Sequence, residues 1–91
     1  MCTTIGCSIA VSGSGKGPHG WFAVDQVNLS YDHPYHAQLE HSVNIDFTNG
    51  ADPSGTRVAV ELTRESARAL ALQLLAIVDE AEAYEAHAAQ L

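Results

Sequence analysis

The chain has 91 residues and a formal net charge of −7, with eleven acidic residues against four Lys and Arg. This length fits one domain, residues 1–91, and the hydrophobic fraction of 46% is that of a globular protein. A surface this acidic repels nucleic-acid phosphates and anionic lipid headgroups, so we expect neither nucleic acid nor a membrane as a partner. The N-terminus lacks the basic and apolar regions of a signal peptide, and no run of about 18 apolar residues occurs. A cytoplasmic location is therefore expected.

Alternating apolar residues predict four β-strands in the first two thirds of the chain. The strands are expected at residues 3–11, 21–31, 41–49 and 57–62. Residues 12–20 are rich in glycine and predict a flexible turn, and Gly and Pro predict a second turn at 50–55. The alternation of the second strand breaks at Asp25–Gln26, which indicates a bulge that turns both of its apolar sets toward one core.

The last third of the chain predicts a single helix. Thr63 is a suitable N-cap, and the helix should run from Arg64 to about Ala89. Its apolar stripe is typical of a helix that lies on a core, and it consists of Ala67, Leu70, Leu74, Ile77, Val78 and Ala81. We therefore predict an α+β fold of ββββα order, a four-stranded antiparallel meander with the C-terminal helix packed on one face as a two-layer sandwich. The second sheet face is then either exposed to solvent or covered by another copy of the chain. A homodimer is therefore one of two expected outcomes.

An up-and-down meander brings alternate connections to the same end of the sheet. The chain start, the loop 32–40 and the junction 62–64 should therefore share one rim. The stretch YDHPYHAQLEH, residues 31–41, places three histidines and two acids at that rim. We expect the chemistry of the protein, if it has any, to lie there.

Three imidazoles held on a short segment can ligate a divalent transition metal and leave a position open for chemistry. The predicted metal ligands are His33, His36 and His41, with Cys2 as a fourth. Glu40 is the candidate general base or an additional ligand. Asp32 can orient an imidazole by a hydrogen bond without contacting the metal itself, and Tyr31 can close the pocket with its hydroxyl. The spacing does not distinguish zinc, iron, nickel and copper.

The spacing H-x2-H-x4-H is a weak motif, so two other interpretations stay open. The histidines can serve metal-free acid/base or ligand contacts, or they can belong to a polar loop bonded to its own backbone and to water. A bound metal would suit a hydrolase, lyase or isomerase. The alternative is a non-catalytic dimeric module that binds a small molecule or a protein.

Several short stretches together resemble a known family. They are MCT at the start, GWF (20–22), DHPYHAQLEH (32–41), NIDF (44–47), RVAVEL (57–62) and ESAR (65–68). As a set they resemble a family of small actinobacterial proteins of unknown function. The resemblance implies a shared fold, and it brings no activity with it.

Overall fold

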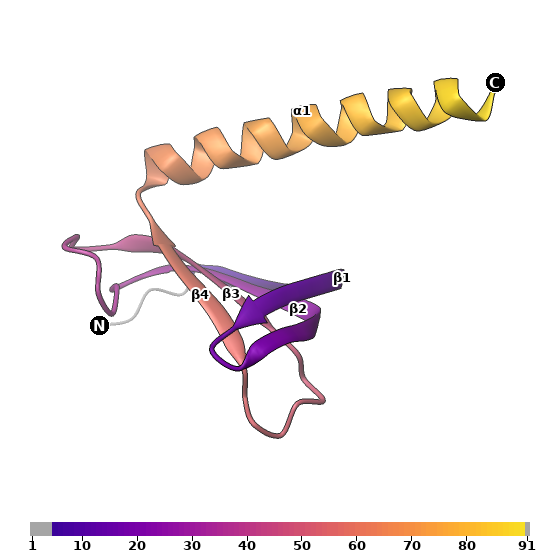
Figure 1. The fold of residues 1–91 in the computed structure, drawn as a ribbon. Helices are drawn as coiled ribbons and strands as arrows, with labels where there is room; N and C mark the ends of the chain where they lie inside the picture. Colours follow the sequence, from indigo (N-terminus) through magenta and orange to yellow (C-terminus); the bar gives the residue numbers. More distant parts are fainter. Residues whose placement is uncertain (1–4, 91) are drawn as a thin grey trace.

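The computed structural model describes residues 5–90, and its four strands form one antiparallel sheet in sequential order (Figure 1). The elements are β1 (Gly6–Gly17), β2 (Gly20–Asp32), β3 (Ser42–Thr48), β4 (Arg57–Leu62) and α1 (Arg64–Ala89). The predicted ββββα order and the antiparallel meander are confirmed. No helix in this part of the chain has the length and apolarity needed to cross a membrane.

The first hairpin is longer than the sequence predicts. Residues 12–17 were expected in a flexible turn, but they continue β1 and pair with the start of β2, down to Gly17 opposite Gly20. The turn is reduced to Pro18 and His19, and Gly20 follows it with a φ of 120°, a conformation that favours glycine. The glycines and serines of SGSGKG weaken a strand. The strand forms here because β2 pairs with it down to the turn.

A bulge interrupts this hairpin where the alternation of β2 breaks. Ala10 pairs with Gln26 and Gly13 pairs with Val24, so two residues of β1 lie opposite Asp25 alone. A bulge is therefore present at the predicted break, but its extra residue belongs to β1 and not to the second strand. Val24 and Val27 flank it and are both buried, each 6% exposed, and they line one hollow. The bulge has the expected effect of turning both apolar sets to the same side.

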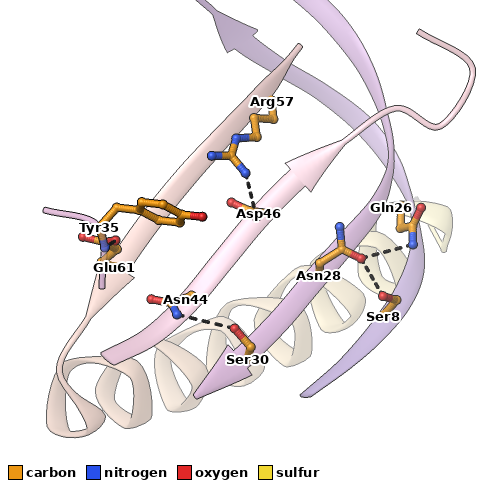
Figure 2. A network of polar contacts seen from close by, with 9 residues as sticks. All are labelled: Ser8, Gln26, Asn28, Ser30, Tyr35, Asn44, Asp46, Arg57 and Glu61. Atoms are coloured by element: carbon orange, nitrogen blue, oxygen red, sulfur yellow. Dashed lines mark hydrogen bonds and ion pairs between the residues drawn. The ribbon is translucent and has the colours of Figure 1, made fainter. Parts of the chain in front are cut away.

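The sheet has one apolar and one polar face. Cross-strand rows on the apolar face are Ile9–Val27–Phe47–Val58 and Cys7–Leu29–Ile45–Val60. The polar face carries Ser8, Gln26, Asn28, Ser30, Asn44, Asp46, Arg57 and Glu61 (Figure 2). Side chains alternate along a strand, so the antiparallel register gathers residues of one kind on one side.

Helix α1 starts as predicted but does not lie along the sheet. The Thr63 hydroxyl accepts the Ser66 backbone N–H at 3.0 Å, which confirms the N-cap. In the helix only Ala67 is half-buried, and every other residue is exposed. Figure 1 shows the first turn next to the sheet and the remaining turns standing apart from it. The predicted packing of the helix on one face, which would complete a two-layer sandwich, is therefore limited to its first turn.

The reason for this difference lies in the connection between β4 and α1. Thr63 is the single residue between them, and its backbone is extended, with φ −66° and ψ 159°. One residue leaves too little chain to turn the helix axis back onto the sheet. The apolar stripe of the helix and much of the apolar sheet face consequently remain uncovered within one chain.

Candidate functional site

The connection between β2 and β3 lies at the end of the sheet where α1 begins, as the meander predicts. Tyr31, Val43 and Leu62 are direct neighbours across the three strands at this rim. From there the loop 33–41 folds back over the polar side of β4. The polar face and this loop together form the candidate site.

Glu61 of β4 holds the loop in place. Its carboxylate accepts the backbone N–H groups of Tyr35, His36 and Ala37, the last two at 3.0 and 2.8 Å. Three donors on one carboxylate favour its ionised form. The Ala37 and Tyr35 N–H groups, with a smaller contribution from His36, hold the pKa of Glu61 below its ordinary value.

His33 and His41 come together at the base of the loop. Their ring centroids are 4.8 Å apart with an interplanar angle of 26°, and His41 stacks in turn on Tyr31 at 5.5 Å. His33 Nδ1 lies 3.0 Å from the Glu40 carbonyl oxygen. A carbonyl only accepts, so this bond places the proton on Nδ1 and leaves His33 Nε2 to accept a proton or a metal ion.

The other predicted site residues have different surroundings. His36 is exposed, and its backbone N–H bonds Glu61. The Asp32 carboxylate accepts the His33 backbone N–H at 2.7 Å. Glu40 takes part through its carbonyl oxygen, and Cys2 lies outside the described residues. Between residues 5 and 90, no group of three or more His, Cys, Asp and Glu side chains is arranged to hold a metal ion.

A pocket of about 370 Å³ opens between the loop and the polar sheet face. Its floor comes from β2, β3 and β4, through Ser30, Asn44 and Asp46 among others, and His33, Pro34 and Tyr35 form the loop side. The Tyr35 side chain extends over this face with its hydroxyl directed toward the middle of the sheet (Figure 2). At 96% exposed, its ring stands at the mouth of the pocket.

The pocket contains one arginine. Arg57 Nη1 and Asp46 Oδ2 form an ion pair at 3.3 Å, and the Arg57 side chain is 52% exposed (Figure 2). A guanidinium has five N–H donors in a fixed plane, and Asp46 takes one of them. Asn44 beside this pair is anchored through its carbonyl oxygen, which accepts the Ser42 hydroxyl at 2.6 Å.

Glu61, Arg57 and Tyr35 were absent from the predicted site. A signal for Glu61 did exist: in RVAVEL it falls on the phase opposite Val58, Val60 and Leu62, at the rim that the meander assigns to the loop. The contact with the loop backbone, however, depends on how residues 33–37 fold back, which no spacing in the sequence specifies.

Comparison with known proteins agrees with the resemblance noted from the sequence. The model of a family of unknown function, DUF6295, matches residues 1–88. The chain belongs to this family. Neither the curated proteins nor the solved structures gave a match to the chain. Membership in DUF6295 assigns no activity, so a functional proposal has to be built on the geometry of the site.

Proposed function

We propose that the chain is a binding protein for a small polar molecule that carries a carboxylate or carbonyl group. The observation behind this proposal is the Arg57 guanidinium, half-exposed in a pocket of about 370 Å³ with one donor engaged by Asp46. Pockets of this size suit small molecules, and a planar guanidinium bonds carboxylates in a bidentate manner.

The acidic residues of the pocket do not compete with this role. Glu61 is engaged by three backbone N–H groups, and Asp46 is paired with Arg57. Asp32 accepts the His33 N–H. The ligand would meet the remaining guanidinium donors, and Asp46 would fix the plane of the arginine.

Tyr35 supplies the second contact of the proposed site. It stands at the mouth of the pocket, and its backbone is fixed by Glu61 while its side chain is free to adjust. An aromatic ring with a hydroxyl covers the apolar part of a ligand and can donate to its polar end. Because the loop is already pinned to β4, little ordering is required when the ligand binds.

Titration monitored by NMR tests this proposal. The full chain is titrated with a panel of small mono- and dicarboxylic acids and their amides, and saturable shifts are expected for Tyr35, Asn44 and Arg57. Arg57→Gln removes the guanidinium and should abolish these shifts. Arg64→Gln, an arginine at the start of the helix, is the matched control and should leave them unchanged. Shifts that survive Arg57→Gln, or no saturable shift with any compound, would contradict the proposal.

A second candidate function is binding of a divalent transition metal at His33 and His41. It is favoured by the bond from His33 Nδ1 to the Glu40 carbonyl, since metal-ligating histidines commonly fix their other nitrogen in this way. His36 and Cys2 are the candidates for the remaining ligands. A metal here would act as a Lewis acid or lower the pKa of a bound water, and hydrolase, lyase or isomerase chemistry stays a prediction.

Metal binding has its own test. Protein purified without a histidine tag is analysed for zinc, iron, nickel and copper and is then titrated with each ion by calorimetry. One metal per chain is expected, with His33→Ala lowering the affinity by at least about tenfold and His87→Ala, near the helix end, having no effect. Absence of binding to all four ions, or equal loss in both variants, would eliminate this candidate.

A further inference from the structure

The chain exposes far more surface than a compact protein of its mass. Its accessible surface is 7081 Å², whereas a folded monomer of 9.7 kDa is expected to expose about 5100 Å². The radius of gyration is 15.9 Å, against about 12 Å for a compact domain of this length. The excess of about 2000 Å² per chain corresponds to about 4000 Å² for two chains, within the range of obligate homodimer interfaces.

Exposed apolar side chains are concentrated in two places. The four large residues of the helix stripe are 44–60% exposed: Leu70, Leu74, Ile77 and Val78. On the apolar sheet face Ile9 is 49% exposed, and Leu29, Ile45 and Val60 are only half-buried. Figure 2 looks onto the polar face and shows α1 behind the sheet, hence on the side of the apolar face. The two uncovered surfaces therefore belong to the same side of the molecule.

The helix stripe also faces that side. Ala67 belongs to the stripe, and it is the one helical residue that the sheet half-buries. Residues at spacings of three and four share a helix face, so Leu70, Leu74 and Ile77 continue the stripe from Ala67 along the same side. Beyond the first turn, nothing in the described part of the chain covers them.

The charges of α1 are arranged for an antiparallel partner. On one flank of the stripe, Arg64 lies in the first turn and Glu82 in the second half of the helix. Arg64 and Glu82 are about five turns apart at ~3.6 residues per turn, so they flank the stripe on the same side. A two-fold axis perpendicular to two antiparallel helices brings each flank against the same flank of the partner. Arg64 of each copy then comes near Glu82 of the other.

From these observations we infer that the apolar side of the molecule is a homodimer interface, with a second copy of this chain as its occupant. The α1 helices of the two copies run antiparallel about an axis near residue 75, between the apolar faces of the two sheets. Leu74 of one copy then lies beside Ile77 of the other, and Arg64 lies near Glu82 on the flank of the stripe. The pocket under Tyr35 opens on the other side of the sheet and stays accessible in the dimer.

The mass of the full chain in solution tests the interface. Light scattering after size exclusion at about 50 μM should give twice the chain mass of 9.7 kDa. Leu74→Glu places a charge in the apolar interface and should give the monomer mass. Leu72→Glu, outside the stripe on an exposed leucine, is the matched control and should stay dimeric. A monomeric or larger wild-type species, or a dimer that survives Leu74→Glu, would overturn the inference.

A charge-reversal pair tests the antiparallel arrangement without touching the apolar stripe. Arg64→Glu should raise the dimer dissociation constant about tenfold, because it changes two symmetric attractions into repulsions. The double variant Arg64→Glu/Glu82→Arg should restore the wild-type constant. If Arg64→Glu has no effect, or if the double variant fails to restore the constant, the antiparallel dimer is refuted, even if Leu74→Glu unfolds the chain.

Discussion

The apolar core opposite the pocket makes a quantitative prediction for Val27→Ala. Val27 is 6% exposed, with Ile9 and Phe47 as its cross-strand neighbours. The substitution removes two methyl groups, a transfer loss of about 1.6 kcal/mol at about 0.8 kcal/mol each, and the cavity raises the cost to about 2–3 kcal/mol. A chain of this length has a stability of about 5–14 kcal/mol, so a large fraction of it depends on one side chain.

Urea unfolding followed by circular dichroism, at pH 7 and one fixed protein concentration, measures this cost. The midpoint should fall by about 1–2 M with an unchanged slope. Leu72→Ala is the control: it deletes a larger group, but Leu72 is 59% exposed on the outer side of the helix and alanine favours helix. Its cost should stay within about 0.5 kcal/mol. Equal costs for the two variants would refute the assignment of the core to the apolar sheet face.

Three further predictions concern the loop and the helix. Glu61→Gln removes the charge and one acceptor oxygen. The backbone amides of Tyr35 and Ala37 should then exchange with solvent faster, while the sheet amides keep their exchange rates. Unchanged exchange of the loop amides would show that Glu61 does not hold the loop. The pKa of Glu61 in the folded chain lies below its ordinary value of 4.5. Its stabilisation of the loop is therefore complete above pH 4.5 and is lost as the pH falls through the lower folded pKa. The same exchange measurement across this pH range should detect the loss. Thr63→Ala removes the acceptor for the Ser66 N–H and should cost about 1 kcal/mol in unfolding experiments, whereas Thr63→Ser should retain most of it; equal losses would argue against the cap.

The backbone plan was predictable because its signals are local and repeated. β4 has the predicted bounds, the bulge falls at the predicted break at Asp25–Gln26, and the N-cap is Thr63. The extension of β1 through Gly17 was missed, because glycine and serine carry no strand pattern and the pairing is supplied by β2. The separation of α1 from the sheet beyond its first turn was missed as well. An apolar stripe indicates that something covers the helix, but not whether the cover is the same chain or another one.

The site could be located from the sequence but not assembled from it. The meander correctly predicted that the loop 33–41 and the end of β4 share one rim, and His33 and His41 do meet there. The partners that organise the loop are backbone groups: the Glu40 carbonyl on His33 and the N–H groups that bind Glu61. Every residue type carries such groups, so their roles leave no trace in the pattern of side chains. The pocket at Arg57 depends on the same backbone contacts.

We infer different roles for the two faces of the sheet: an open polar face for a ligand and an apolar face covered by a second copy of the chain. Methyl relaxation of the full chain in the presence of a soluble gadolinium chelate tests both parts in one sample. The methyl groups of Ile45, Leu74 and Ile77 should be protected, whereas those of Ala59 on the polar face and Leu72 on the outer side of the helix should relax strongly. Strong relaxation of Leu74 and Ile77, equal to that of Leu72, would contradict the account.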